Sequence, residues 1–240
     1  LFGGLVVAWL ALRCLRRADG ARWSQPVLVA AGIAAAVAPV TVRNVAAGGE
    51  FALVSTNGGQ TLAQGNRQGA AGVAAPLPGF SGRIEQQQEE EIAVASRALG
   101  RPVSPVEASS WWTRQVVSFA TERPGEFASL LVRKAAWALH AREGREQYDL
   151  AYEARFAPVL AWLCLPFPLL AGLGAYGAWR GRRGRSANDT TLIGLYVLTG
   201  LATLVAFMVS SRYRAPIVPA LAVLAGAGAA ALAGDARRRD

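Results

Sequence analysis

The stretch from Thr191 to Gly234 decides the fold: TLIGLYVLTGLATLVAFMVS (191–210), SRYR (211–214) and APIVPALAVLAGAGAAALAG (215–234). Each apolar run is 20 residues long, and about 20 helical residues cross the hydrocarbon core of a membrane. Because no water reaches that depth, a helix is expected for both runs, since a helix satisfies its own backbone. The sequence therefore predicts two membrane helices joined by a short turn that carries two arginines.

Apolar segments recur outside this hairpin, at residues 1–12, 26–42 and 156–179. The chain has 240 residues, and 52% of them are hydrophobic, which is more than is usual for a soluble domain. We therefore expect an α-helical integral membrane protein with about five spans. Because Leu1 already lies inside an apolar run, we interpret the first span as truncated and the chain as part of a longer protein.

The distribution of charge predicts how the spans are oriented. The net charge is +9, yet residues 43–155 carry twelve basic and twelve acidic side chains and are neutral. The excess lies in short loops beside the apolar runs, with arginines at 13, 16, 17, 22, 180, 182, 183, 185, 237, 238 and 239. Basic loops of this kind stay in the cytoplasm. This predicts residues 43–155 and the turn 211–214 outside, and it argues against nucleic acid as a partner.

Three regions follow from this orientation: two membrane helices with a basic loop (1–42), an extracytoplasmic subdomain (43–155), and three membrane helices with a basic loop and tail (156–240). For the subdomain we expect a small, mostly helical α+β structure. Residues 50–55 have strand character, Asn57-Gly58 indicates a turn, and residues 61–63 return as a second strand. Helical patterns follow from residues 84, 105 and 124, the second with Ser104 and Glu107 as a capping box.

The sequence gives no support for a metal or nucleotide site. Cys14 and Cys164 lie in separate apolar runs without metal-ligand neighbours, and His140 is the only histidine. Gly172, Gly174 and Gly177 match a dinucleotide fingerprint, but that fingerprint needs a preceding strand, which an apolar span does not supply. We interpret these glycines as points of close helix packing, and we predict no cofactor. Whether a divalent metal assists is left open.

Two charged elements lie where spans meet the outer surface, Arg43-Asn44 and Arg212-Tyr213-Arg214. A guanidinium has the shape to bind phosphate oxygens, so we predict that Arg43, Arg212 and Arg214 converge on a lipid phosphate or diphosphate. The alternative is that they simply reach the interface. The candidate substrate-loop residues are Asn44, Asn57, Asn66 and Tyr213. Asn57 and Asn66 are predicted to hydrogen-bond a sugar or the loop backbone, with a turn-shaping role as the alternative.

The ordered pieces resemble the second half of bacterial membrane glycosyltransferases of the GT-C class (glycosyltransferase family 39), relatives of protein O-mannosyltransferases and of the lipid A aminoarabinose transferase. The resemblance covers about residues 26–234. It is carried by Pro39–Asn44, Gly49–Phe51, Ser55–Gly59, Gly65-Asn66, Pro124–Phe127, Arg133-Lys134, Trp137, Tyr152–Phe156, Arg212–Pro216 and Pro219. The chain departs from the family at Val40, at Leu62–Gln64 and after Trp137, where substrate contacts can differ.

The resemblance implies transfer of a sugar from a polyprenyl-phosphate donor to a lipid, glycan or protein acceptor at the outer face of the bacterial cytoplasmic membrane. It also implies that the catalytic Asp lies in a loop upstream of Leu1, so no catalytic residue is assigned within this chain. Two other functions stay open. A transporter or flippase of lipid-linked material would share the spans and the arginines. A non-catalytic scaffold of envelope assembly would use the neutral outer section as a partner surface.

Overall fold

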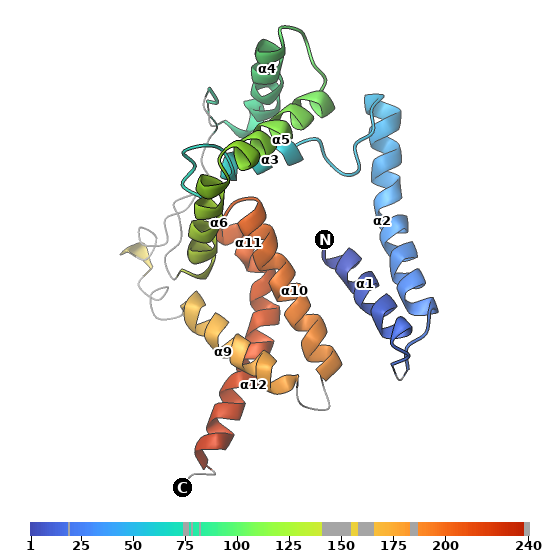
Figure 1. The fold of residues 1–240 in the computed structure, drawn as a ribbon, viewed down its shortest axis with the longest axis vertical. Helices are drawn as coiled ribbons and strands as arrows, with labels where there is room; N and C mark the ends of the chain where they lie inside the picture. The colour runs from blue at the N-terminus through green and yellow to red at the C-terminus, as the bar shows by residue number, and fades with distance from the viewer. Residues whose placement is uncertain are drawn as a thin grey trace. The chain divides into compact units, whose positions relative to one another are not determined.

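The computed structural model describes residues 1–18, 20–73, 77, 79–81, 83–140, 155–157, 166–182 and 187–237 (Figure 1). Cys164 and the basic positions 183, 185, 238 and 239 lie outside these ranges. The described residues form α1 (Phe2–Leu15), α2 (Ser24–Gly48), α3 (Gly58–Gly65), η1 (Ile84–Gln86), α4 (Gln87–Leu99), α5 (Pro105–Glu122), α6 (Pro124–Leu139), α9 (Phe167–Gly181), α10 (Ala187–Ala206), α11 (Ser211–Arg214), η2 (Ala215–Ile217) and α12 (Val218–Arg237).

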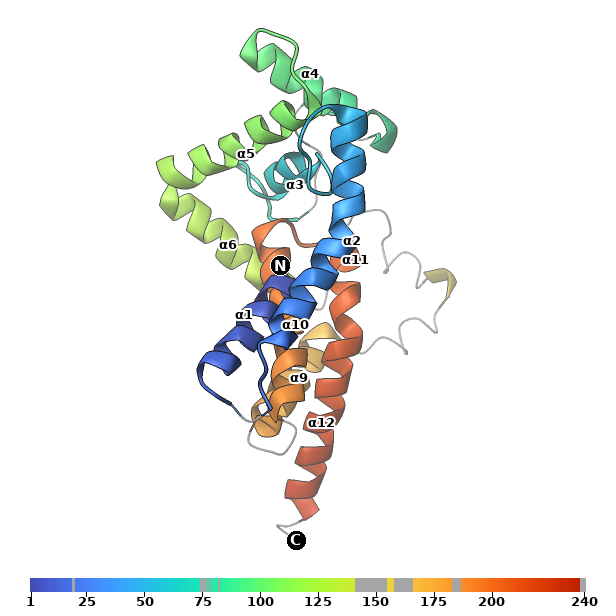
Figure 2. The same ribbon diagram turned by 90° about the vertical axis from the view of Figure 1, so that its right-hand side faces the viewer.

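The chain forms two compact units. Unit 1 comprises Leu1–Ala63 and Pro76–Thr121, and unit 2 comprises Gln64–Ala75 and Glu122–Asp240. In unit 1, α1 packs along α2, and α4 packs on α5 through a small apolar core of Ala95, Val103 and Ala108. In unit 2, α9 and α12 form the most extensive helix pair, and α10 packs on α6, α9 and α12 (Figure 2). Among the described residues, unit 1 contains one membrane-length helix, α2, and unit 2 contains α10 and α12. The expected regions 1–42, 43–155 and 156–240 stay a prediction.

Within the described part of the chain, three helices are long and apolar enough to cross a membrane: Ser24–Gly48, Ala187–Ala206 and Arg212–Asp235. This is the architecture of a helical membrane protein, as the sequence predicts. The other two expected spans are shorter where they are described, since α1 has 14 residues and α9 has 15. Part of the expected segment 156–179 lies outside the described residues. The structure thus supports three of the five predicted spans.

The predicted strand pair is wrong. Residues 50–55 follow α2 as an irregular segment, and residues 61–63 lie inside α3. Among the described residues the only β-type pairing is an isolated bridge between Val73 and Val209. The Asn57-Gly58 pair leads into a helix instead of a hairpin, because Thr61 donates its backbone N–H and its hydroxyl to the Asn57 carbonyl. The described part of the expected subdomain is therefore helical, not α+β.

The predicted helices of that subdomain are confirmed. A 3₁₀ turn begins at Ile84 and leads into α4, which ends at Gly100 in the left-handed conformation that favours glycine. Proline occupies the first position of both α5 and α6, where its missing N–H costs nothing and its fixed φ suits a helix. The boundaries were predictable because proline and the capping residues mark them locally.

The three glycines of the fingerprint pattern lie within α9; Gly174 and Gly177 lie against α12, whereas Gly172 leaves open space. A side chain at Gly177 would collide with the carbonyl of Leu224, and one at Gly228 would collide with the carbonyl of Leu173. Small residues at these two positions let the helix backbones approach closely, as is typical of membrane helix pairs. The packing interpretation is confirmed for Gly174 and Gly177 but not for Gly172, and the strand that a dinucleotide fingerprint requires does not precede these glycines within α9.

Candidate functional site

A polar cavity of about 470 Å³ opens in unit 1 at the C-terminal end of α2, a membrane-length helix. Three of the predicted site residues line it, namely Arg43, Asn44 and Asn57. Its volume lies within the range of about 300–1,000 Å³ that is usual for small-molecule sites. The Arg43 side chain is exposed, and its guanidinium makes no hydrogen bond or ion pair with any described residue. The cavity therefore presents an unneutralised cation.

Asn44 shapes one wall of this cavity. Its Nδ2 donates to the carbonyls of Ala52 and Val54, each at 3.1 Å, and the Thr41 hydroxyl donates to the Leu53 carbonyl at 2.7 Å. These side chains on the last turns of α2 take the carbonyls that a strand partner would otherwise bind. The segment after α2 is thus folded back against the helix that carries Arg43.

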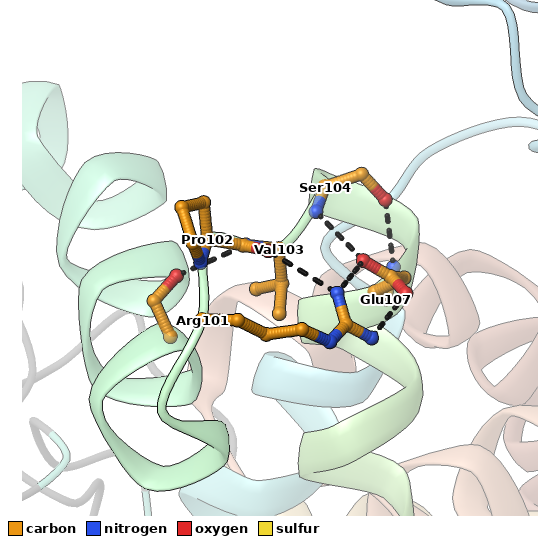
Figure 3. Close-up of polar contacts among 6 residues, drawn as sticks. Arg101, Pro102, Val103, Ser104 and Glu107 are labelled. Atoms are coloured by element: carbon orange, nitrogen blue, oxygen red, sulfur yellow. Dashed lines mark hydrogen bonds and ion pairs between the residues drawn. The ribbon is translucent and has the colours of Figure 1, made fainter.

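The opposite wall includes Pro105 and Val106 at the start of α5, and the predicted capping box fixes that start (Figure 3). The Ser104 hydroxyl accepts from the backbone N–H of Glu107, and the Glu107 carboxylate accepts from that of Ser104, both at 3.2 Å. Arg101 adds two hydrogen bonds to the same carboxylate, at 2.8 and 3.1 Å. The hydrogen bonds from Arg101 and then from Ser104 lower the pKa of Glu107 to about 2, so the box stays intact at physiological pH.

The third wall is the turn that leads into α3, with Ser55, Thr56 and Asn57. Gly59 fixes this helix to α5, because its backbone N–H donates to the Ser109 hydroxyl at 2.9 Å. A side chain at Gly59 would overlap the Ser109 carbonyl. The glycine-rich stretch is therefore a contact between helices as well as a turn. It presents Asn57, exposed, at the cavity.

A different polar centre lies in unit 2 around Lys134 of α6, whose side chain is 0% exposed. Its ammonium donates to Asn66 Oδ1 at 2.7 Å and to the carbonyls of Val205 and Phe207 at 3.0 and 2.8 Å. Asn66, 1% exposed, donates its Nδ2 to the carbonyls of Ala206 and Phe207. The last carbonyls of a helix lack partners within it, so Lys134 and Asn66 together cap the C-terminal end of α10.

Close backbone approach makes this cap possible. A side chain at Gly65 would collide with the Phe207 carbonyl, and Gly72, at φ +88°, lies against the Lys134 side chain. The backbone N–H of Val209 donates to the Gly72 carbonyl at 3.2 Å. Burial lowers the pKa of Lys134 from the ordinary 10.5 to about 8. The three acceptors oppose that shift, because only the charged amine carries three protons to donate.

The arginines of the second predicted element have unlike surroundings within unit 2. Arg214 is 5% exposed, donates Nη1 to the His140 carbonyl at 2.9 Å, and lies over the Phe167 ring. Arg212 is exposed, lies over the Tyr213 ring and contacts the Tyr213 hydroxyl at 3.3 Å. Arg214 therefore ties the end of α6 to α11 and α9, while Arg212 and Tyr213 form a surface pair.

The structure thus brings Arg43, Asn44 and Asn57 to one cavity and buries Asn66 and Arg214 elsewhere. Asn66 binds the carbonyls of Ala206 and Phe207 at the end of α10, and its role in a substrate loop stays a prediction. The convergence of Arg43 with Arg212 and Arg214 stays a prediction, since the two units are described separately. Sequence analysis missed the role of Lys134. A signal was present, because Lys134 lies four residues from Leu130 and four from Ala138, on the buried face of α6.

The described residues include no group of three or more His, Cys, Asp or Glu side chains that could hold a metal ion. Comparison of the chain with protein-family models, with curated proteins and with solved structures gave no match. The resemblance to membrane glycosyltransferases therefore stays a prediction that rests on the quoted motifs.

Proposed function

We propose that the chain is part of a membrane glycosyltransferase that moves a sugar from a polyprenyl-phosphate donor to an acceptor at the outer face of the bacterial cytoplasmic membrane. The observation that carries this proposal is the cavity at the end of α2, where the unpaired Arg43 faces amide and hydroxyl groups. A lipid-linked donor has its phosphate at the membrane surface and its sugar just beyond. The end of a membrane-length helix is the place where such a donor needs a cation.

In this proposal Arg43 binds the donor phosphate. A guanidinium offers paired N–H groups to phosphate oxygens, and these bonds strengthen as negative charge develops on the leaving phosphate. The side chains of Asn57 and Gln88 and the carboxylate of Glu50 line the same cavity. Amides and a carboxylate bind sugar hydroxyls by hydrogen bonding, and the carboxylate also discourages a ligand that is anionic throughout.

The reaction would break the bond between the anomeric carbon and the phosphate oxygen and form a bond to the acceptor hydroxyl, whose proton passes to a base. The resemblance assigns that base to an Asp outside this chain. We assign Arg43 and Arg212 to phosphate binding, and we give Arg214 a positioning role, because it is buried against the His140 carbonyl. Asn44 positions the segment from Ala52 to Val54 along the cavity wall.

The test is transfer of labelled sugar from a polyprenyl-phosphate donor by the full-length protein in detergent, with Arg43→Gln and Arg97→Gln compared. Arg97 is an exposed arginine of unit 1 that does not line the cavity. We expect transfer by the wild type and by Arg97→Gln, and a large loss with Arg43→Gln. If common donors give no transfer while lipid-linked sugar crosses vesicle membranes, the transporter takes the place of this proposal.

A further inference from the structure

A second cavity, of about 530 Å³, lies in unit 2 among α9, α10 and α12. Its walls are apolar or lack a side chain over most of their length, with Gly172, Ala175, Gly194, Leu198, Leu201 and Leu224. Gly172 and Gly194 leave open space, since a side chain at either would meet nothing within 4 Å. The cavity runs along α10, which is long and apolar enough to cross a membrane, so its natural occupant is a hydrocarbon chain.

One end of this cavity is polar. There α9 ends and α10 begins, and Arg182, Thr190 and Thr191 line the wall. Arg182 is exposed, and its guanidinium makes no hydrogen bond or ion pair with any described residue. Arg180, two positions earlier, differs: it forms an ion pair with Asp235 at 3.0 Å, and Tyr176 donates to the same carboxylate. One arginine is thus neutralised within the protein, and the other is left for an anion at the mouth of an apolar cavity.

From this arrangement we infer that the cavity binds one acyl chain of an anionic glycerophospholipid, with the lipid phosphate on Arg182. Basic pockets between membrane helices on the cytoplasmic side commonly bind anionic head groups, and the charge pattern predicts that side for this end of the cavity. The anionic lipids of that leaflet join a phosphate to hydrocarbon chains and carry a net negative charge, which suits a single arginine. The site is separate from the Arg43 cavity and does not depend on the proposed sugar transfer.

The test is native mass spectrometry of the full-length protein in detergent with added phosphatidylglycerol, phosphatidylcholine or polyprenyl phosphate. Two variants attack the site: Arg182→Gln removes the cation, and Gly194→Leu fills the cavity. Each has a matched control outside it. Arg180→Gln removes a neighbouring arginine, and Gly226→Leu places the same side chain on α12, where nothing lies within 4 Å. Thermal unfolding of each variant shows whether it is folded.

We expect the wild type to retain phosphatidylglycerol in preference to phosphatidylcholine. Arg182→Gln should weaken phosphatidylglycerol binding about tenfold, which is the usual worth of a hydrogen bond to a charged group, and should remove the preference. Gly194→Leu should abolish binding of both phospholipids, and both controls should bind as the wild type does. Equal binding by Arg182→Gln and Arg180→Gln would overturn the inference, as would preferential retention of polyprenyl phosphate or unchanged binding by Gly194→Leu.

Discussion

The Arg43 cavity of unit 1 and the Lys134 centre of unit 2 each contain a basic side chain and an asparagine, but the basic side chains have different surroundings. Each pairs a cation with an asparagine whose Nδ2 donates to two backbone carbonyls, Asn44 to Ala52 and Val54 and Asn66 to Ala206 and Phe207. In unit 2 the cation is buried and has three acceptors. In unit 1 it is exposed beside a cavity. The unused donors of Arg43, and not the residue types, make the cavity of unit 1 the candidate binding site.

The largest expected effect comes from removing the buried cation, Lys134. Lys134→Met keeps the apolar stem but removes the ammonium donor from Asn66 Oδ1 and the Val205 carbonyl, while the Phe207 carbonyl keeps its hydrogen bond from Asn66 Nδ2. A buried polar group that loses its partner costs about 1–3 kcal/mol. We expect a loss of about 3–5 kcal/mol in the free energy of unfolding, measured by thermal or denaturant unfolding in detergent. Arg133→Met, at an exposed neighbouring position, should change it by less than about 0.5 kcal/mol. Equal stability of the two variants would contradict the structural role of Lys134.

Removal of the exposed cation, Arg43, should reduce sugar transfer and leave stability almost unchanged. Arg43→Gln removes the proposed phosphate ligand but no side-chain contact with a described residue, so stability should stay within about 0.5 kcal/mol of the wild type. Sugar transfer should fall about 100-fold in kcat/KM, equivalent to about 2.7 kcal/mol, since removal of one charge-stabilising donor has that effect in other enzymes. The measurement is steady-state transfer beside an unfolding curve. A stability loss as large as that of Lys134→Met would show that Arg43 is structural.

In these two regions, the sequence predicted a structural feature correctly when the feature is determined by residues that are close together in the chain. The start of α5 was readable because Ser104, Pro105 and Glu107 act within one turn. The apolar runs that became α2, α10 and α12 were readable because span length is a property of each run by itself. The candidate cavity was located in part for the same reason, since Arg43 and Asn44 lie at the end of an apolar run.

The errors have causes that are distant in sequence. Lys134 meets Asn66 across 68 positions and Phe207 across 73, so no local pattern could reveal that both cap α10. The expected strand at residues 50–55 failed because Thr41 and Asn44 take its carbonyls from the preceding helix. A segment with strand propensity still needs a partner for its backbone, and here the side chains of the preceding helix bind its carbonyls in place of a neighbouring strand.

A smaller effect is expected from a substitution that weakens one wall of the Arg43 cavity. Ser104→Ala removes the capping hydroxyl at the start of α5, where Pro105 and Val106 line the cavity. We expect a stability loss of about 1 kcal/mol, as is usual for such caps, with a fall in transfer smaller than that of Arg43→Gln. Ser110→Ala, at an exposed position within the same helix, serves as the control. Transfer that falls as far as in Arg43→Gln would mean that α5 contacts the donor more closely than its capping role requires.

A pH dependence of stability is expected from the Lys134 centre. Because burial lowers the pKa of Lys134 from 10.5 to about 8, the folded state releases its proton before the unfolded state does. Between pH 8 and 10.5 the unfolded state then binds more protons, so the free energy of unfolding should rise with pH across that window. Lys134→Met cannot titrate, and the difference between wild type and variant isolates this contribution. A wild-type stability that falls across the window would mean that the three acceptors hold the proton more tightly than burial releases it. In that case Lys134 would keep its proton at every pH at which the protein folds.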